Sequence, residues 1–597
     1  MPFAVYTNTV NQGSLLLRLA CGVLPAIAAW GQQYTINTFA GNQSLGAGYG
    51  GDNQAATSDQ LNGPIAAAVD ANGNIYIADA LNHRVRKVSG GTITTIAGTG
   101  TAGYTGDGTA ANTAELNTPS GVAVDSAGNV YIADTQNNVI RKVGTDGKIS
   151  TYAGNASLGP GFGGDNNPPN SAGAQFSKPI GLAFDPSGNL YIADSGNNLV
   201  RKVKSDGSLL TTAVGQGLTI QTLNNPVALA VDPTGSYMYI ADLGGKRIAR
   251  FQFSNNAVTT LAGNGSSGYS PDGPISIGTA LNNAAGVATD AAGNVYIADT
   301  VNSLIRVVTP NGASGYLTTI AGHVLSGGRP IPGFSGDGGP ATSAQVNSPK
   351  GLAIDKSGNV YVADTGNNIV RILQPNRPSI ANGGIGNAFS FKTQISPGAA
   401  ASIFGTGLAT TSSTPSAPLP VNVGGVTVTV NGQFAPLYYI SSGQINFQVP
   451  WETGTGTASV VVSANGLASS AASVQVVSAG PGLNQYIQNY PAYSINSSTN
   501  PIPAGGTIIA YVTGSGPVSP SQNDGALPGS SNVNVTSTCT ATIGSQNAVV
   551  GFCGLQPNSV GLVQVNITVP SGLSTGTYPL TISINGQASN SQNVSVN

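Results

Sequence analysis

The chain has very little charge for its length. Among its 597 residues, Asp, Glu, Lys and Arg make up only 7%, and the formal net charge is −2. Nucleic-acid binding requires clustered Lys and Arg that contact phosphates, and the sequence has no basic patch or stripe. We therefore predict that nucleic acids are not partners. The Gly, Ser, Thr and Asn that take the place of charged residues are typical of an extracellular β-protein.

The residues that usually perform catalysis are also scarce. The chain has two histidines, His83 and His323, and two glutamates, Glu115 and Glu452. Histidine is the usual general base near neutral pH, and a zinc site needs several ligands that converge. No Ser-His-Asp order, nucleotide-binding loop or cysteine nucleophile stands out. The composition favours a binding protein over an enzyme.

A long apolar run occurs only at the start of the chain. It extends from Leu15 to Ala29 and is interrupted by Arg18. We predict that residues 1–31 are a signal peptide and that the protein is secreted or extracytoplasmic. A disordered apolar N-terminus is the alternative, since no Lys or Arg precedes Arg18. No later stretch suits a transmembrane helix, so we predict no membrane span.

Two cysteines follow the predicted signal peptide. Cys539 and Cys553 flank residues 540–552, which we predict to be a β-hairpin that turns at 544–547. In a secreted protein such a pair favours a disulfide, and two buried thiols are the alternative. The pair is too sparse for a metal site.

One short pattern recurs six times in the first two-thirds of the chain. Each copy has an apolar triplet, Asp, two residues, Gly-Asn, a Tyr-[Ile/Val]-Ala-Asp run, and then Asn and Arg. The second aspartates are separated by 55, 60, 48, 57 and 65 residues. A period of this length indicates stacked or radial repeats rather than separate domains. These aspartates are Asp79, Asp134, Asp194, Asp242, Asp299 and Asp364.

Each copy can form a four-stranded blade. In the second copy we predict strands at 121–125, 130–134, 139–143 and 149–154, with turn residues between them. Four antiparallel strands per repeat are typical of a β-propeller. The last copy lacks a fourth strand, and an extra fourth-strand motif stands at 34–41. We predict that this N-terminal strand completes the sixth blade and removes the open sheet edges.

Two stretches resemble NHL repeats: Tyr76-Ile77-Ala78-Asp79-Ala80-Leu81-Asn82-His83-Arg84-Val85 and the matching residues 131–140. The resemblance recurs over residues 34–373 and implies a six-bladed NHL propeller. The fourth copy departs from the pattern, because Gly245 replaces the Asn and Ala249 replaces the Arg. The family includes protein-binding and RNA-binding modules and a metal-dependent amidating lyase, so the fold alone does not give the function.

The repeated aspartates allow two interpretations. They could surround a channel and bind calcium, or they could accept hydrogen bonds from turn amides and from the Asn three residues later. Because the residue recurs in every copy, we favour a structural role. We predict no cofactor, identify no metal ligands and keep calcium as the alternative. An Arg seven residues later could pair with a nearby carboxylate in five copies: Arg86, Arg141, Arg201, Arg306 and Arg371.

The loops between the repeats are candidates for a binding surface. Five of the six carry an Asp in a Gly-rich setting, without the ligand pattern of an EF-hand. They join outer to inner strands, so they crowd one face of the ring, and loops on a rigid scaffold often bind ligands. Turns that order the loop are the plainer interpretation. The candidate binding residues are His83, Asp107, Asp165, Asp337 and Arg329.

The pattern changes after Leu373. Residues 374–378 read as a linker, and two similar segments of about a hundred residues follow, the size of an immunoglobulin-like sandwich. Residues 444–450 parallel 564–570, and residues 460–463 parallel 580–583. The stretches 387–391 and 404–408 resemble the TIG/IPT-like module of secreted bacterial proteins. That resemblance implies an accessory or attachment role.

The sequence therefore predicts an all-β protein: a six-bladed β-propeller closed by an N-terminal strand, then two immunoglobulin-like β-sandwich domains. The predicted segments are 1–31 (signal peptide), 32–376 (propeller), 377–480 and 481–597 (sandwiches). We expect a secreted, non-enzymatic binding or scaffold protein that engages a protein or glycan through the loop face. A calcium-dependent hydrolase or lyase is the alternative. The sequence names neither the ligand nor the oligomeric state.

Overall fold

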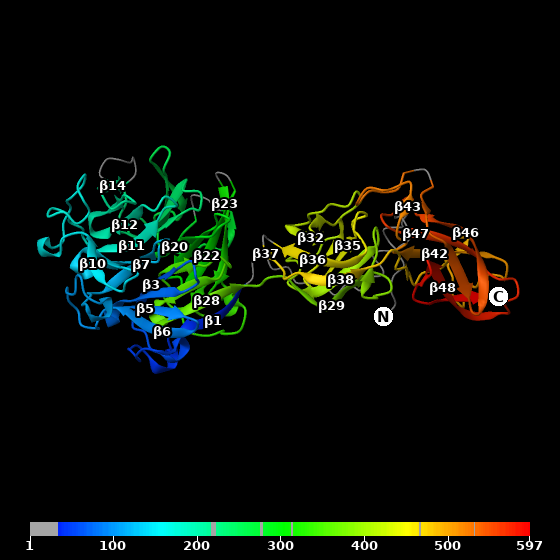
Figure 1. Cartoon of the computed structure of the whole chain (residues 1–597), viewed down its shortest axis with the longest axis horizontal. Coiled ribbons are helices and arrows are strands. Elements are labelled where there is room, and N and C mark those ends of the chain that lie inside the picture. The colour runs from blue at the N-terminus through cyan, green and yellow to red at the C-terminus, as the bar shows by residue number, and fades with distance from the viewer. Residues whose placement is uncertain (1–33, 216–221, 275–278, 312–313, 465–466, 530–531) are drawn as a thin grey trace. The chain divides into compact units, whose positions relative to one another are not determined.

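The computed structural model describes residues 34–215, 222–274, 279–311, 314–464, 467–529 and 532–597. Within them the fold is all-β, and every helix is a 3-10 turn of three residues. The described chain forms two compact units that meet at Asn376 and Arg377 (Figure 1). No helix in the described segments is long and apolar enough to cross a membrane. The predicted signal peptide, residues 1–31, lies outside the described residues.

The first unit contains six antiparallel sheets that each have a similar four-strand path in the described residues. Each path begins with an apolar strand and continues through the Tyr-[Ile/Val]-Ala-Asp strand to the strand that carries Arg. In chain order the strands are β3 (Pro64–Val69), β4 (Ile75–Asp79), β5 (Arg84–Ser89), β6 (Thr92–Ala97); β7 (Pro119–Val124), β8 (Val130–Asp134), β9 (Val139–Val143), β10 (Ile149–Ala153); β11 (Pro179–Phe184), β12 (Leu190–Asp194), β13 (Leu199–Val203), β14 (Leu210–Val214); β15 (Pro226–Val231), β16 (Tyr237–Asp242), β17 (Arg247–Gln252), β18 (Ala257–Ala262); β20 (Gly286–Thr289), β21 (Val295–Asp299), β22 (Leu304–Asn311), β23 (Ser314–Ala321); β26 (Leu352–Ile354), β27 (Val360–Asp364), β28 (Ile369–Pro375) and β1 (Tyr34–Ala40).

Short elements decorate these sheets. Two-residue strands add a fifth strand to the first and fifth sheets, and one small hairpin lies in the loop before the last sheet. These strands are β2 (Gln54–Ala55), β19 (Gly273–Pro274), β24 (His323–Val324) and β25 (Pro330–Ile331). The 3-10 turns are η1 (Gln43–Leu45), η2 (Ala56–Ser58), η3 (Ala80–Asn82), η4 (Ala111–Thr113), η5 (Thr135–Asn137), η6 (Ala156–Leu158), η7 (Ser195–Asn197), η8 (Ala341–Ser343) and η9 (Thr365–Asn367).

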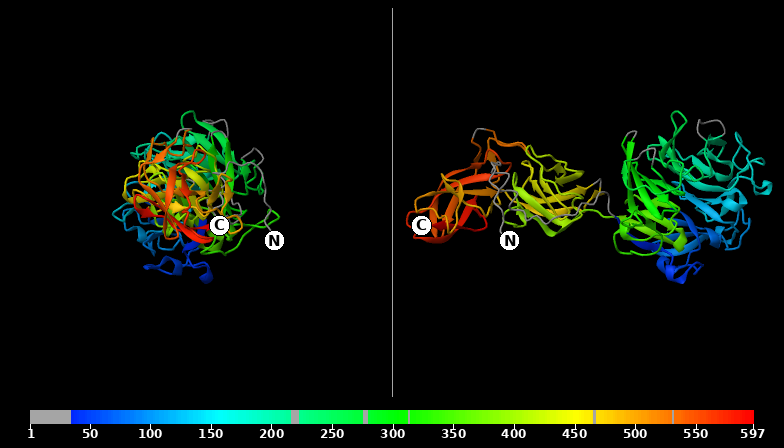
Figure 2. Two further views of the ribbon diagram at one scale, coloured as in Figure 1. Left: turned by 90° about the vertical axis from the view of Figure 1, so that its right-hand side faces the viewer. Right: turned by 180° about the vertical axis from the view of Figure 1, so that it is seen from behind.

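The N-terminal strand belongs to the last sheet, as predicted. β1 pairs antiparallel with β28, and Tyr34 stands opposite Pro375. Figure 1 shows blue β1 beside green β28, and the rear view in Figure 2 again places blue segments against green ones. This pairing corrects the predicted linker at 374–378, because Gln374 and Pro375 still lie in β28. The two ends of the first unit are therefore held together by main-chain hydrogen bonds.

The first strands of neighbouring sheets approach each other at small residues. A Cβ atom on Gly181 would lie 2.7 Å from the Cα of Ala228, and one on Gly351 would lie 2.5 Å from the carbonyl oxygen of Ile65. The N–H of Gly351 donates to that oxygen at 2.8 Å. Glycine is required here because backbone, not a flexible side chain, occupies the space.

Replacement of one of these glycines should loosen the ring. We expect Gly181→Ala to lower the free energy of unfolding by about 1–3 kcal/mol, the usual cost of overpacking. Gly173→Ala is the matched control, since a Cβ atom there would meet nothing within 4 Å. Chemical denaturation of both variants measures the difference, and equal stability would show that the close approach does not constrain the fold.

The second unit is built from two sheets and a larger strand assembly. The first sheet contains β29 (Ser379–Asn387), β31 (Ala400–Thr406), β34 (Leu437–Ile440) and β35 (Gln444–Gln448). The second contains β30 (Gln394–Ile395), β32 (Val426–Val430), β33 (Gln433–Phe434), β36 (Gly456–Ala464), β37 (Leu467–Ala468) and β38 (Ala472–Val476). The third contains β39 (Gly482–Leu483), β40 (Gln488–Tyr490), β41 (Ser494–Ile495), β42 (Thr507–Thr513), β43 (Val518–Ser519), β44 (Asn534–Val535), β45 (Cys539–Ile543), β46 (Gln546–Leu555), β47 (Val563–Thr568), β48 (Gly576–Ile584), β49 (Gln587–Ala588) and β50 (Gln592–Val596).

The internal duplication extends to side-chain contacts. Gln444 donates to Asn446 at 2.9 Å, and Gln564 donates to Asn566 at 2.8 Å. The hydroxyl of Ser469 accepts the Val462 N–H at 3.1 Å, and Ser589 does the same for Ile582. Each copy has its own apolar core. Repeated contacts of this kind indicate that the two segments share one fold.

The two copies nevertheless form one compact unit. The N–H of Ala400 donates to the Thr513 hydroxyl at 2.5 Å, and the Tyr438 hydroxyl donates to the Val560 carbonyl at 2.9 Å. Asn387, in the stretch that resembles the TIG/IPT-like module, is buried and donates to the Gly480 carbonyl at 3.0 Å. The predicted boundary at 480/481 therefore lies inside a packed unit.

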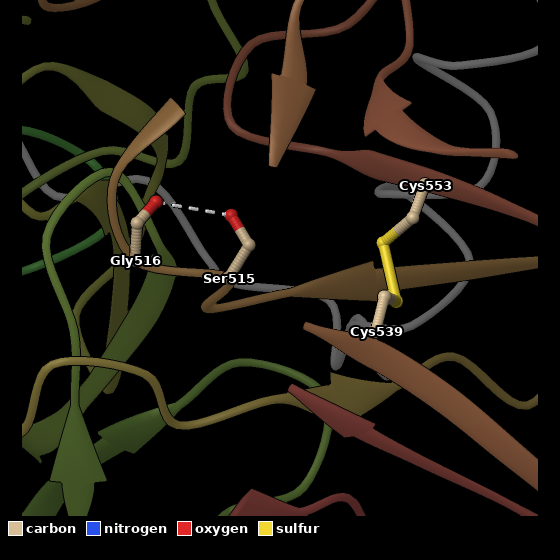
Figure 3. The surroundings of a disulfide bond; sticks show 4 residues. All are labelled: Ser515, Gly516, Cys539 and Cys553. Carbon is tan, nitrogen blue, oxygen red and sulfur yellow. Dashed lines mark hydrogen bonds between the residues drawn. A yellow bond between two sulfur atoms is a disulfide. The ribbon is translucent and has the colours of Figure 1, made fainter. Parts of the chain in front are cut away.

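Cys539 and Cys553 form a disulfide with Cα atoms 6.6 Å apart (Figure 3). Their hairpin turns at Gly544 and Ser545, more tightly than the predicted 544–547, because Ile543 pairs directly with Gln546. β45 pairs with β48, whereas the end of β46 that carries Cys553 pairs with β47. The disulfide therefore connects two groups of strands within the second unit.

Loss of this disulfide should destabilise the second unit only. The closed loop is short, with a sequence separation of 14. We expect the double variant Cys539→Ser, Cys553→Ser to lower the free energy of unfolding of this unit by about 3 kcal/mol, because the unfolded chain gains conformational entropy when the cross-link is absent. Differential scanning calorimetry of the full chain should show one transition shifted downward and the transition of the first unit unchanged. An unshifted profile would contradict a stabilising role.

Candidate functional site

The same buried ion cluster occurs in five of the repeats. In the second, Asp134 ends β8 and accepts the Asn117 N–H and the Asn137 amide, both at 2.7 Å. Arg141 on β9 lies with one guanidinium nitrogen 3.6 Å from Asp134 and the other 2.7 Å from Asp107 of the preceding loop. Its side chain is fully buried. One arginine therefore connects the loop to the second strand.

The loop aspartate also contacts the fourth strand of its own sheet. Asp165 accepts the Thr212 hydroxyl at 2.6 Å, and Asp337 accepts the Thr38 hydroxyl of β1 at 2.6 Å. The cluster thus joins the loop, the second strand, the third strand and the fourth strand. The pairs of buried arginine and loop aspartate are Arg86–Asp52, Arg141–Asp107, Arg201–Asp165, Arg306–Asp272 and Arg371–Asp337.

The fourth repeat achieves a similar contact with a different residue. Asp242 accepts the Asn224 N–H at 2.6 Å, as in the other repeats. Gly245 and Ala249 remove the usual Asn and Arg, and Arg247 donates to Asp242 at 2.9 Å instead. Arg247, five residues after Asp242, therefore supplies the guanidinium that Ala249 cannot supply.

Burial opposes ionisation of the second-strand aspartates. It raises the pKa of Asp79 to about 7 and the pKa of Asp134, Asp194, Asp299 and Asp364 to about 6. The backbone N–H, the Asn amide and the guanidinium each act in the other direction, because they stabilise the carboxylate. These carboxylates have their acceptor positions occupied from inside the fold.

This geometry assigns the predicted binding residues Asp107, Asp165 and Asp337 to a structural role. Each is engaged by a buried arginine, and binding through any of them stays a prediction. Arg329 is exposed between β24 and β25, and binding through it stays a prediction. In the described residues no group of three or more His, Cys, Asp or Glu side chains could hold a metal ion. Calcium binding likewise stays a prediction.

His83 also has a structural partner. It ends the turn after β4 with a left-handed φ of 53°, and its Nδ1 accepts the Thr118 N–H of the next repeat at 3.1 Å. Burial and the neighbouring Arg84 lower the pKa of its imidazole. Equivalent residues make the same connection: Asn138 to Lys178, Asn198 to Asn225, Ser303 to Ser348, and Asn368 to Gly63. We describe this set as the inter-repeat latches, and ligand binding through His83 stays a prediction.

The sequence reasoning missed a set of aromatic residues. Each of the five loops with an Asp also has Gly-[Tyr/Phe] three residues before it. The ring stacks over the buried guanidinium, with distances to the ring centre of 4.7 Å for Phe162 and 4.9 Å for Tyr104. Part of these rings stays exposed, since Tyr104 is 40% and Phe162 39% exposed. We call Tyr49, Tyr104, Phe162, Tyr269 and Phe334 the loop aromatics.

Comparison with known families agrees with the repeat pattern. Residues 99–161 and 167–335 match the teneurin NHL domain. Residues 61–88 and 346–373, at the two ends of the first unit, match the NHL repeat. The chain contains NHL repeats. The NHL region corresponds to the first unit, where the buried clusters and the latches lie.

The NHL region also has relatives among well-described proteins. Mouse teneurin-4 is 25% identical over 332 residues, which cover 51% of this chain and 10% of teneurin-4. The chloroplastic protein SUPPRESSOR OF QUENCHING 1 of Arabidopsis thaliana is 27% identical over 324 residues, which cover 53% of this chain and 25% of that protein. The chain thus spans a tenth to a quarter of the length of these relatives.

Solved structures resemble the NHL region more distantly. An auxiliary nutrient binding protein from Bacteroides ovatus is 17% identical with a TM-score of 0.44, covering 58% of this chain and 78% of its own. A gluconolactonase from Xanthomonas campestris is 17% identical with a TM-score of 0.35, covering 60% and 99%. At these TM-scores neither carries an argument about function.

Removal of one buried arginine should destabilise the NHL region strongly. We expect Arg141→Ala to cost about 3–5 kcal/mol, because Asp134 then stays buried without its counter-charge. Lys204→Ala is the control: its pair with Asp206 is solvent-exposed and should contribute little. Equilibrium denaturation compares the two, and a similar small effect for both would rule out the structural importance of the cluster.

Proposed function

We propose that this protein is an exported, non-enzymatic binding protein. The six sheets form a closed six-bladed NHL propeller, and residues 377–480 and 481–597 form two immunoglobulin-like sandwiches that act as a spacer or attachment module. Closure is supported by the β1–β28 pairing and by the latch from Asn368 to Gly63. The predicted signal peptide and the disulfide support export, because disulfides persist in oxidising compartments.

This proposal depends on the surface formed by the inter-repeat loops and by the turns that follow the second strand of each repeat. The charged groups of the repeat are paired inside the fold, and apolar side chains are left outside. Leu45, Leu158 and Leu325 in the loops, and Leu81 and Val301 in the turns after the second strands, are exposed. With the loop aromatics they define what we call the loop face. Exposed apolar groups on a rigid scaffold are typical of an interaction surface.

The chemistry of the loop face indicates a partner of low charge. Partly exposed aromatic rings can stack on sugar rings, and apolar side chains among polar loops can pack against a protein. Each loop aromatic is held from behind by a guanidinium, so little side-chain freedom is lost on binding. We therefore propose a protein or a glycan as the ligand.

The loop aromatics should be required for binding. We expect a Tyr104→Ala, Phe162→Ala double variant to lose binding at least tenfold, because aromatic anchors dominate such interfaces. Phe434→Ala is the matched control, since this exposed aromatic residue lies on β33 of the second unit and not in the inter-repeat loops. Glycan arrays and binding to purified envelope proteins, with unfolding midpoints measured in parallel, are the assays.

Three results separate the alternatives. Selective loss in the double variant supports the loop face, and equal loss in Phe434→Ala contradicts it. Turnover of lactone or ester substrates that chelator abolishes and calcium restores would replace the binding proposal with a calcium-dependent hydrolase or lyase.

A further inference from the structure

A cavity of about 260 Å³ lies where the first strands of the six repeats begin. One residue near the start of each first strand lines it, with Ala285 and Lys350 just before their strands, and five of these six residues are uncharged. These residues are Ile65, Ser120, Ile180, Val227, Ala285 and Lys350. Val122, Leu182, Leu229, Val287 and Leu352, two residues further along, also line it and are buried. The cavity therefore has apolar walls and one cation.

Lys350 is an exception to the repeat. In the first and third repeats an isoleucine occupies its position. In every repeat the next residue along the chain is glycine or alanine. No hydrogen bond or ion pair reaches its ammonium group within the described part of the chain. Burial alone lowers the pKa of this lysine. An unpaired, partly desolvated ammonium is costly unless an anion meets it.

Several other polar groups of the lining already have hydrogen-bond partners in the protein. The Ser120 hydroxyl already donates to the Thr118 carbonyl at 3.1 Å. The N–H of Gly351 is taken by Ile65, and the N–H of Asn225 is taken by Asn198. A ligand would therefore be oriented by a single charge, with its remaining surface against Ile, Val, Leu and Ala side chains.

The size of the cavity limits the ligand. A cavity of roughly 150 Å³ accommodates benzene, so this one has room for about ten non-hydrogen atoms. An inorganic anion would leave the apolar walls unused, and a neutral apolar molecule would leave the ammonium unpaired. A small carboxylate with an apolar body satisfies both.

We propose that the cavity at the centre of the NHL region is a binding site for a small amphiphilic carboxylate, with the carboxylate on Lys350 and the apolar body between the first strands. The site lies at the ends of the first strands that the inter-repeat loops enter, and it uses none of the residues that define the loop face. Lys350 supplies the charge, and Ala285 leaves part of the room, since two other repeats have isoleucine at its position.

Octanoate is a suitable probe, and the full chain is the sample. We expect calorimetric titration to give a Kd below about 1 mM. Lys350→Met keeps the length and apolar stem but removes the charge, and should weaken octanoate binding at least tenfold, the usual worth of a charge-assisted hydrogen bond. Ala285→Ile fills part of the cavity and should weaken it as well. Lys178→Met is the control, because this lysine precedes the third repeat's first strand and does not line the cavity.

Comparison ligands test the two halves of the proposal. Octanol should bind more weakly than octanoate and equally to the wild type and Lys350→Met, and acetate should bind much more weakly than octanoate. The proposal is overturned if octanoate does not bind the wild type, if Lys350→Met binds it equally while its unfolding midpoint is unchanged, or if acetate binds as tightly. In the supporting case, the NMR signal of ¹³C-methylated Lys350 should shift with octanoate, and no other lysine signal should follow the same titration.

Discussion

The NHL region depends on a guanidinium held between two carboxylates and covered by a ring. In the second repeat, Arg141 lies between Asp134 of the strand and Asp107 of the loop, with Tyr104 stacked above it. A buried charge is tolerated only where counter-charges and hydrogen bonds compensate for lost hydration. The cluster meets that condition and also fixes the loop relative to three strands. It defines the register of the repeat as well as its charge balance.

This arrangement explains how a chain with so little charge uses what it has. Five of its 21 Lys and Arg residues are fully buried arginines, and each faces aspartates of its own repeat. What remains for the surface is mostly hydroxyl, amide and backbone groups, with apolar side chains in the loops. We expect a surface of this kind not to attract polyanions. It suits the neutral or weakly charged partner that we propose for the loop face.

Two kinds of contact hold neighbouring repeats together. In each latch, a side chain from the turn after a second strand accepts a hydrogen bond from a backbone N–H of the next repeat. The glycines and alanines of the first strands let the backbones of neighbouring repeats approach closely. The latch residue adopts a left-handed conformation, which Asn tolerates well. The close central packing leaves a small cavity with mostly apolar walls, so a single lysine there gives it a positive charge.

The sequence by itself determined the strands, the repeat period and the displaced N-terminal strand. Alternation, turn residues and the recurring Asp134-type carboxylate are local signals, and local signals are sufficient for these features. The sequence also indicated that the repeated aspartates are structural. It could not pair Arg141 with Asp107, which lies 34 residues away, because that contact exists only after a loop folds over two strands.

Only the tertiary structure decided the surroundings of His83 and Lys350. His83 lies in an apparently exposed turn, yet its Nδ1 meets the backbone of a residue 35 positions later. Lys350 follows a proline as other residues do in other repeats, and only the folding of the first unit brings it to an apolar cavity shared with the other first strands. A residue's neighbours along the chain set its backbone conformation. Its neighbours across the ring set its desolvation and its partners, and these decide its chemistry.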